Sequence, residues 1–214
     1  MLGTIAPLPF PAVAQADELL PVMILLVRHG ATEWSLDGRH TGRMDLPLTQ
    51  EGIAQAENVG ELIGRILGGR SAIVYTSPLE RARHTAALAM PHNEATVVDA
   101  LAEYDYGRYE GLTSAQIDEK HPGWNLFIDG CPGGESLTQV AARCDSFIAK
   151  LERTSAGRAV VAFTHGHLSR ILTCRLLGLE PIHGRLLEND TASVGTIVPK
   201  RGQLVLDGWN RRVY

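Results

Sequence analysis

The sequence reads Leu25-Leu26-Val27-Arg28-His29-Gly30 near its N-terminus, where an apolar run ends abruptly in arginine, histidine and glycine. A continuous apolar run rich in branched residues is typical of a strand buried in a parallel sheet, and we expect such a strand over 22–27. A histidine at the end of this strand is placed to meet a ligand rather than to pack. A second site of this kind, Thr164-His165-Gly166-His167, follows the apolar run 159–163. Two strand-end histidines, each followed by glycine, predict one active site built from both halves of the chain.

Length and composition indicate one globular domain. The chain has 214 residues, of which 44% are hydrophobic and 21% charged, enough for one sizeable core. The formal net charge of −4 argues against nucleic acid as the main partner. No apolar run approaches the length of a membrane span, so no membrane partner is expected. A homodimer is left open.

The three cysteines point to a reducing, cytoplasmic setting. Their number is odd, and the spacing of Cys131, Cys144 and Cys174 matches no zinc or redox motif. Cys144 also fits the apolar face of a helix and is expected in the core.

Residues 1–21 are expected to form a flexible extension outside a single domain over 22–214. The segment contains four prolines and no basic residue. Ala14-Gln15-Ala16 is similar to a signal cleavage site, but the positive n-region is missing and prolines interrupt the apolar part. A flexible extension, or a true start at Met23, is therefore favoured over a signal peptide.

Strands alternate with helices along the rest of the chain, which predicts a three-layer α/β sandwich with a mostly parallel central sheet. Besides 22–27, strands are expected over 72–76, 96–98, 159–163, 192–198 and 203–206. Helices are expected after the caps Thr49 and Ser136, over 79–90 and over 167–177, and the first of them ends at Gly68.

Three of the predicted strands lead into charged or nucleophilic groups, at 28–30, 77–81 and 164–167. Because ligands in open α/β sheets bind beyond the carboxyl ends of the strands, we expect Arg28 and Arg81 to converge with the two strand-end histidines. Arginine forks match phosphate oxygens, so the natural occupant of this positive pocket is a phosphoryl group. The histidines without such a context, expected at the surface or in loops, are His40, His84, His92, His121 and His183.

Six segments in a fixed order strengthen this interpretation. They are Leu26–Trp34, Thr41-Gly42 with Asp45–Thr49, Thr76–Ala82 with Thr85, Glu103–Gly111, Pro132–Ser136 and His165–His167. In these segments the chain resembles the histidine phosphatase superfamily, the phosphoglycerate-mutase-like group. The resemblance covers about Met23 to Arg170.

The resemblance implies roles in phosphoryl transfer without a metal or a cofactor. His29 would be the nucleophile that takes the phosphoryl group as a phosphohistidine. Arg28, Arg81 and His165 would hold the phosphoryl oxygens. Glu103, in the acidic, glycine-bearing loop 102–111, would protonate the leaving oxygen and then deprotonate the attacking water. The residues expected to line the substrate side are Trp34, Thr41, Gly42, Ser77, Tyr106 and Gly166.

Hydrolysis is favoured over mutase chemistry, because the mutases of this group carry an Arg-His-Tyr-Gly loop and a longer insertion where this chain has Tyr104-Asp105-Tyr106-Gly107. Trp124 and the segment 129–135 are most similar to sugar-bisphosphatase and acid-phosphatase members. The expected substrate is thus a small phosphorylated metabolite, with sugar phosphates favoured. Alpha-ribazole-phosphate phosphatase and phosphoglycerate mutase activities stay as alternatives within the group.

Two alternatives come from other classes of protein. His165-Gly166-His167 could be half of a metallohydrolase site, although the sequence shows no accompanying cluster of Asp, Glu and His. The chain could also bind a phosphorylated ligand without catalysis, although both His29 and Glu103 are present. The cations that could meet a second phosphate or carboxylate are Arg39, Arg43 and Arg108.

Overall fold

The computed structural model describes residues 21–155 and 157–213, and its centre is a six-stranded sheet. The strands, in the order β3-β2-β4-β1-β5-β6, have the bounds β1 (Met23–Arg28), β2 (Ala72–Thr76), β3 (Ala95–Val97), β4 (Ala159–Thr164), β5 (Val194–Lys200) and β6 (Gln203–Arg211). The pairs β3–β2, β2–β4 and β4–β1 are parallel, whereas β5 runs antiparallel to β1 and to β6. Only β5 therefore opposes the others, and the prediction of a mostly parallel sheet is confirmed.

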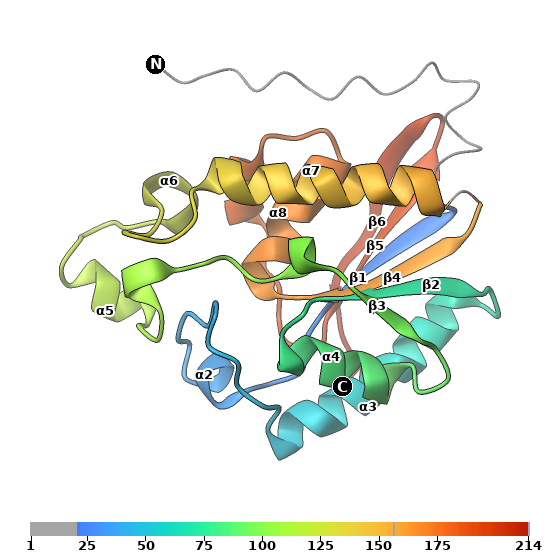
Figure 1. Cartoon of the computed structure of the whole chain (residues 1–214), viewed down its shortest axis with the longest axis horizontal. Coiled ribbons are helices and arrows are strands. Elements are labelled where there is room, and N and C mark those ends of the chain that lie inside the picture. The colour runs from blue at the N-terminus through green and yellow to red at the C-terminus, as the bar shows by residue number, and fades with distance from the viewer. Residues whose placement is uncertain (1–20, 156, 214) are drawn as a thin grey trace.

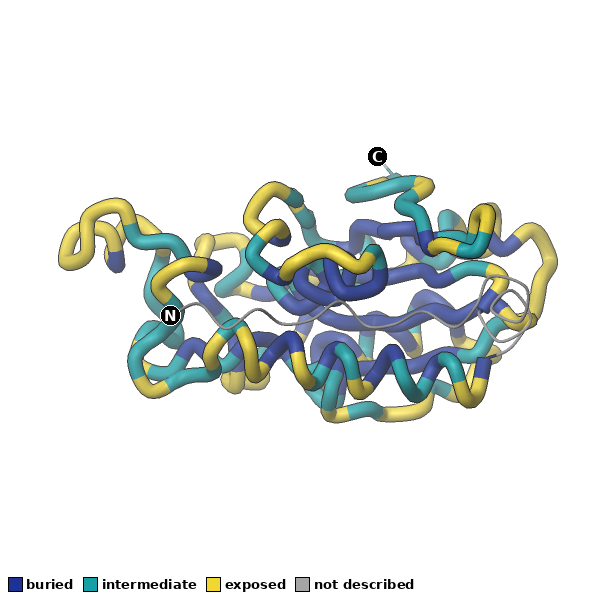
Figure 2. The backbone as a smooth tube through the Cα atoms, turned by 90° about the horizontal axis from the view of Figure 1, so that it is seen from above, coloured by how far each residue is buried: buried dark blue, intermediate teal, exposed yellow. Residues whose placement is uncertain are grey.

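Two helical layers cover the sheet (Figure 1). Helices α3 (Gln50–Leu67) and α4 (Glu80–Ala89) lie on one face, and α7 (Leu137–Thr154) and α8 (Gly166–Leu176) lie on the other. Side chains of β1 alternate between these layers, as the pleat requires. Leu25 and Val27 belong to the core beneath α3, while Ile24 and Leu26 belong to the core that contains Phe147 of α7. Figure 2 shows the buried middle of the fold in dark blue, with exposed segments around it in yellow.

Local capping explains where the long helices begin and end. The Thr49 side chain accepts a hydrogen bond from the Gly52 amide at the start of α3, and Gly68 ends the helix with φ 56°. Ser136 and Gln139 form a capping box at the start of α7. These caps were predicted, because hydroxyl side chains satisfy free amides at helix N-termini and glycine adopts left-handed backbone at little cost.

Five of the six predicted strands differ at their ends from the observed ones: β1 lies one residue later than predicted, and β4 extends one residue further, to Thr164. β3 begins one residue earlier than predicted, at Ala95, and β5 begins two residues later, at Val194. Ala192 has φ 51°, a left-handed conformation that cannot continue a strand. β6 extends beyond the predicted 203–206 and ends at Arg211.

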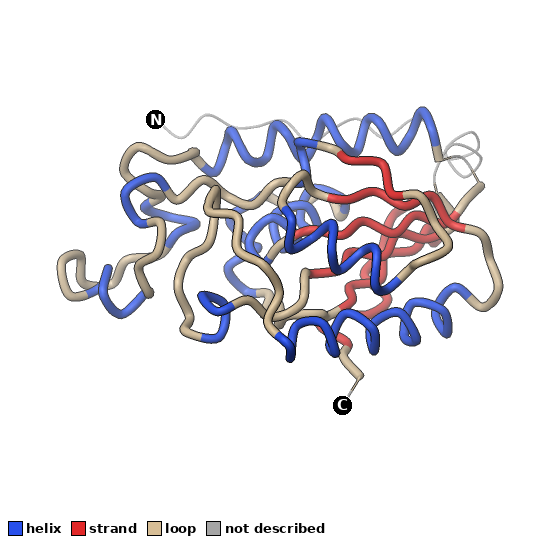
Figure 3. Tube along the Cα trace, turned by 60° about the horizontal axis from the view of Figure 1, so that its bottom comes forward, coloured by secondary structure: helices blue, strands red, loops and turns tan. Residues whose placement is uncertain are grey.

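Short elements that were not predicted gather at the carboxyl ends of the parallel strands (Figure 3). They are α2 (Glu33–Leu36), α5 (Ser114–Asp118), α6 (Leu126–Asp129) and the 3-10 helices η1 (Asp99–Leu101), η2 (Gly107–Tyr109) and η3 (Pro181–Leu186). Cys144 is buried in the core, as expected. Of the predicted extension 1–21, all but Pro21 lies outside the described residues. Within the described part of the chain, no helix is long and apolar enough to cross a bilayer.

Candidate active site

The end of β1 fixes the backbone of His29 on two sides. The His29 amide donates to the Thr164 carbonyl of β4 at 3.0 Å, which continues the parallel pairing beyond the strand. The Gly30 amide donates to Thr85 Oγ1 of α4 at 3.0 Å. A Cβ on Gly30 would collide with the Gly52 carbonyl oxygen, so glycine is required where α3 meets the end of the strand. His29 therefore projects from a rigid junction of sheet and helices.

The His29 imidazole is neutral and has one free nitrogen. Its Nδ1 lies 2.7 Å from the Gly30 carbonyl oxygen, which can only accept, so we assign the proton to Nδ1. Nε2 has no partner among the described residues and is not among the fully buried polar atoms, so it opens into the pocket that His29 lines. Burial, with the charges of Arg81 and Arg28, lowers the pKa of His29 well below its usual value. A neutral imidazole with an Nε2 lone pair is suited to nucleophilic attack.

His165 lies beside His29, with the two ring centroids 5.1 Å apart. Its Nε2 lies 2.7 Å from Ser77 Oγ, at the end of β2, and its Nδ1 is buried without a partner. Burial, Arg81 and His29 lower the pKa of His165 well below its usual value. The ends of β1, β2 and β4 thus meet as the sequence predicted.

The two arginines are held in different ways. Arg28 donates from Nη1 to the Asn189 carbonyl, whereas Arg81 is fully buried and donates to the carbonyls of Thr41, Gly42 and Met44 at 2.8–3.0 Å. The terminal nitrogens of Arg81 thus hold the loop 41–44. The Nε atoms of both arginines are buried without a partner among the described residues. His165 Nδ1 is a third buried nitrogen without such a partner.

Glu103 completes the site from the loop 102–106. Its Oε1 accepts from the Tyr104 and Leu168 amides, both at 2.9 Å, and its Oε2 accepts from the His167 amide at 3.0 Å. The carboxyl group therefore caps the N-terminus of α8, where the free backbone amides stabilise a negatively charged group. A Cβ built on Gly166 would lie 3.4 Å from Arg28 Cζ and 3.6 Å from Glu103 Oε2, so these two groups face the same point.

A pocket of about 250 Å³ opens over these groups. Six predicted site residues line it: Arg28, His29, Thr41, Glu103, Tyr106 and Gly166. Arg81, His165 and Ser77 are fully buried and do not line it. Trp34 lies outside the lining as well, since its ring packs against Gly111.

Gly42 shapes the pocket through the loop that Arg81 holds. A Cβ on Gly42 would lie 2.5 Å from the Tyr104 carbonyl oxygen and 2.7 Å from Glu110 Oε2. The Gly42 amide donates to Glu110 Oε1 at 2.8 Å, and the neighbouring amides of Arg43 and Met44 also donate to the Glu110 carboxylate. Glycine thus allows the loop to lie directly on the acidic loop 102–111.

Eight lining residues were not among the predicted site residues: Ser35, Gly38, Arg39, His40, His167, Arg170, Glu188 and Asn189. His40 lies in a loop, one of the two places expected for it, but it is buried rather than at the surface: it is 9% exposed, with its ring centroid 4.9 Å from that of Tyr106 and 5.4 Å from that of Trp124. His167 Nδ1 lies 2.7 Å from the Tyr106 hydroxyl.

Only some of these residues left a signal in the sequence. Arg170 follows Gly166 by four residues, one helical turn, so its position on the pocket face of α8 could have been predicted. Asn189 lies in the loop before β5 and carried no pattern that pointed to the site.

The candidate cations for a second anion are also resolved. Arg39 lines the pocket and pairs with Asp37 at 3.2 Å, and Arg43 pairs with Asp105 at 3.2 Å outside the lining. Arg108 is exposed and does not line the pocket. Arg170 is held by Nε, which donates to the Gly184 carbonyl at 2.8 Å, and its guanidinium lies 4.8 Å from the Phe127 ring centroid.

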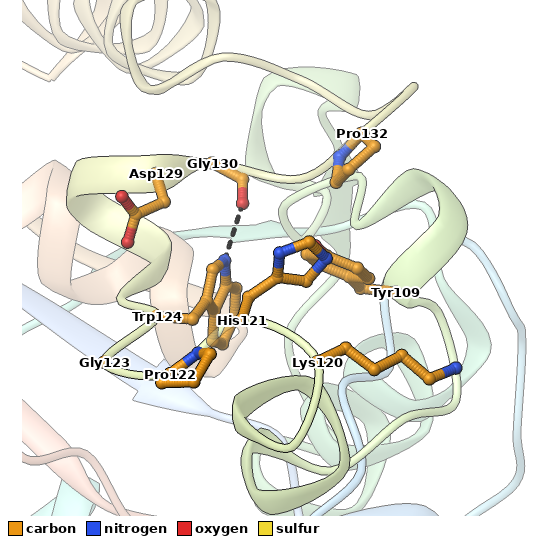
Figure 4. Close-up of a pocket in the computed structure, with 9 residues that line it drawn as sticks. All are labelled: Tyr109, Lys120, His121, Pro122, Gly123, Trp124, Asp129, Gly130 and Pro132. Atoms are coloured by element: carbon orange, nitrogen blue, oxygen red, sulfur yellow. Dashed lines mark hydrogen bonds between the residues drawn. The ribbon is translucent and has the colours of Figure 1, made fainter.

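A larger hollow of about 440 Å³ lies elsewhere, in the segment 109–132 (Figure 4). Tyr109, His121 and Trp124 form its aromatic wall, and the Trp124 indole donates to the Gly130 carbonyl at 2.9 Å. None of the residues that line the His29 pocket lines this hollow. Size alone therefore does not locate the chemistry, and the convergence of His29, Arg28 and Glu103 does.

Potential metal ligands do not cluster in the described part of the chain, where no group of three or more His, Cys, Asp or Glu side chains could hold an ion. His165 and His167 are each hydrogen-bonded to a different hydroxyl, Ser77 and Tyr106.

Comparison with known proteins agrees with this geometry. The family model described as histidine phosphatase superfamily (branch 1) matches residues 24–212. The chain is 44% identical over 173 residues to an acid phosphatase of Mycobacterium tuberculosis, covering 80% of this chain and 84% of that protein. It is 35% identical over 183 residues to a sedoheptulose 1,7-bisphosphatase of Saccharomyces cerevisiae, covering 72% and 67%. The solved structure of an open reading frame product of Mycobacterium tuberculosis matches with a TM-score of 0.84 at 40% identity, covering 89% of this chain and 97% of that one.

Proposed function

The chain belongs to the histidine phosphatase superfamily and is a phosphatase, and we propose that it hydrolyses small phosphomonoesters through a phosphohistidine on His29. One observation carries this proposal. His29 opens its Nε2 into a pocket that Arg28 and Glu103 also line, while Arg81 lies close enough for its charge to lower the pKa of His29, and the ring centroid of His165 is 5.1 Å from that of His29. The buried Nε–H of Arg28, 3.5 Å from a Cβ built on the lining residue Gly166, has no partner among the described residues, and a phosphoryl oxygen at this point would satisfy this costly unpaired donor.

In the first step, His29 Nε2 attacks phosphorus and forms a P–N bond while the bond to the leaving oxygen breaks. The positive charges of the two arginines neutralise the negative charge of the transferring phosphoryl group, because arginine stays protonated even when buried. Glu103 delivers a proton from Oε2 to the leaving oxygen. Oε2 accepts only one hydrogen bond, from the His167 amide, so it has room for that proton.

In the second step, a water molecule attacks the phosphorus of phosphohistidine. Glu103, now a carboxylate, takes the proton of this water, and the P–N bond breaks. Inorganic phosphate and neutral His29 result, so one residue serves as acid and then as base. The Nδ1–H of His29 donates to the Gly30 carbonyl throughout, which keeps Nε2 as the nucleophilic nitrogen in every turnover.

The leaving-group side of the pocket supports sugar phosphates as substrates. Its lining is rich in hydrogen-bonding side chains: His40, Thr41, Tyr106, His167, Arg170, Glu188 and Asn189. Such a wall suits hydroxyl groups better than apolar ones. An acid phosphatase and a sugar bisphosphatase among the relatives agree with this class. Alpha-ribazole phosphate and phosphoglycerates are the alternatives to be tested beside it.

The setting and domain organisation belong to the same proposal. Free Cys131, Cys144 and Cys174 in the described residues support a reducing, cytoplasmic compartment. The family match over 24–212 supports one catalytic domain that begins at about residue 22.

A panel of phosphomonoesters tests the proposal, with kcat/KM measured for sugar phosphates, alpha-ribazole phosphate, phosphoglycerates and 4-nitrophenyl phosphate. We expect inorganic phosphate to be released, and fastest from sugar phosphates. A folded His29→Ala protein should release none. The control is His84→Gln, which changes a histidine of α4 outside the pocket. Isomerised product without phosphate release would indicate a mutase, and undiminished turnover by folded His29→Ala would overturn the mechanism.

A further inference from the structure

Arg143 and Glu135 lie outside the pocket, yet they hold the segment that carries Glu103. We propose that Arg143 is a positioning residue for the acid–base step, which it supports by fixing the backbone on both sides of Glu103. This inference rests on the proposed role of Glu103. Neither residue was among the predicted site residues, and neither lines the pocket.

The Arg143 guanidinium, on α7, uses all five of its donors. Nη1 donates to the carbonyls of Ala100 and Ala102 at 2.9 and 2.6 Å, and Nη2 donates to the Glu103 carbonyl at 3.0 Å. Nε and Nη2 donate to the two carboxylate oxygens of Glu135 at 2.9 and 3.0 Å. The Arg143 and Glu135 side chains are only 18% and 17% exposed, so this fork is largely shielded from water.

The segment needs these partners because it has no regular structure. Residues 103–106 belong to no helix or strand, so no ladder satisfies their backbone groups. Glu135 supplies further partners, since its Oε2 accepts from the Asp105 amide at 2.9 Å and its own amide donates to the Asp105 carbonyl at 3.0 Å. Arg143 and Glu135 thus bracket Glu103, with bonds to the residues before and after it.

The Glu103 carboxyl group is held from the opposite side, by the N-terminal amides of α8. Its position is therefore set by two helices, α7 through the backbone and α8 through the side chain. If the backbone contacts are lost, the carboxyl group shifts relative to His29. A displacement of about 1 Å at a reacting group costs on the order of 100-fold in rate.

The effect should be confined to the proton transfers. Arg143 donates no hydrogen bond to His29, Arg28 or Arg81, so attack on phosphorus keeps its geometry. The charge of Arg143 is one of several that lower the pKa of His165. Arg143→Lys keeps this charge and loses the fork, so it separates geometry from charge.

The test compares Arg143→Lys and Arg143→Met with Arg153→Met, an exposed arginine on the same helix. Single-turnover rates are measured with the best alkyl phosphate of the panel and with 4-nitrophenyl phosphate, whose leaving group needs no acid. Both Arg143 variants should lose about 10- to 100-fold on the alkyl phosphate and keep aryl transfer within about threefold, while Arg153→Met stays at the wild-type rate. In a Glu103→Gln background, Arg143→Lys should add less than about twofold, because both changes act on one step.

Several results would overturn the inference. Equal losses on both substrates would show a merely structural role, and a wild-type rate in Arg143→Lys beside a loss in Arg143→Met would assign the effect to charge. Additive losses in the double variant would show that Arg143 acts elsewhere. If neither Arg143 variant folds, Glu135→Gln, which weakens the same fork, must show the selective alkyl loss. If Glu103→Gln itself spares the alkyl phosphate, the proposed acid fails, whereas a loss in Glu103→Gln beside full activity of the Arg143 variants refutes this inference alone.

Discussion

His40 links the pocket to the pH dependence of stability. It is buried against Tyr106, Trp124 and His167, and burial lowers its pKa to about 4. In the unfolded chain the same imidazole titrates near its ordinary pKa of 6.5. Between about pH 6.5 and pH 4, the imidazole of His40 is protonated in the unfolded state but not in the folded state. The free energy of unfolding therefore falls as the pH is lowered through this range.

The size of this loss follows from the two pKa values. Between about pH 7.5 and pH 5, a shift from 6.5 to about 4 removes about 2 kcal/mol from the free energy of unfolding. Three more histidines add to the acid sensitivity in the same direction, because burial is the main cause that lowers the pKa of each: His29, His165 and His167. His40→Gln removes the His40 share and leaves the other three in place.

Urea unfolding at about pH 7.5 and pH 5 measures the effect, with His92→Gln, at an exposed histidine, as the control. Whatever the substitution costs at neutral pH, the wild-type protein should lose about 2 kcal/mol more than His40→Gln on acidification. Parallel losses in the two proteins, equal within about 0.5 kcal/mol, would refute the reasoning.

Three further predictions concern catalysis. Glu103→Gln should slow hydrolysis of an alkyl phosphate by about 10²–10⁴-fold while an aryl phosphate gives a burst of alcohol before a slow steady state; equal losses on both in single turnovers would mean that Glu103 is not the acid. Exhaustive chelation should leave the initial rate unchanged and vanadate should inhibit competitively, because arginines supply the positive charge; activity restored by zinc after chelation would contradict this. Gly42→Ala, whose Cβ would lie 2.5 Å from the Tyr104 carbonyl oxygen, should lower kcat/KM by about tenfold or more, and a wild-type value would show that the loop yields easily.

The sequence predicted the parts of the fold and site that depend on local pattern. Apolar runs ending at Arg28 and Thr164 located the strand ends, and parallel pairing of β1 with β4 brings His29 and His165 together. The caps Thr49 and Ser136 were readable because a hydroxyl side chain before an apolar helix satisfies its first amides.

What could not be predicted depends on contacts between distant segments. His40 is buried only because Tyr106 and Trp124 pack around it, and no periodicity in its own loop signals this. Arg81 was expected on the phosphoryl group, yet its terminal nitrogens also hold the loop 41–44. In the sequence, Arg143 looks like any other arginine of a helix. Its role depends on three carbonyls of the distant segment 100–103, which accept hydrogen bonds from its guanidinium.

The central claim is that Nε2 of His29 carries the phosphoryl group during turnover. In Glu103→Gln the second step is slow, so mixing with 4-nitrophenyl phosphate and quenching in base should trap the intermediate. Peptide mapping and ³¹P NMR should then find one phosphohistidine, at His29. Its phosphorus should be bonded to Nε2, because Nδ1 is protonated and hydrogen-bonded to the Gly30 carbonyl. Phosphate on another residue, on Nδ1, or on no residue while alcohol is released in a burst would contradict the account.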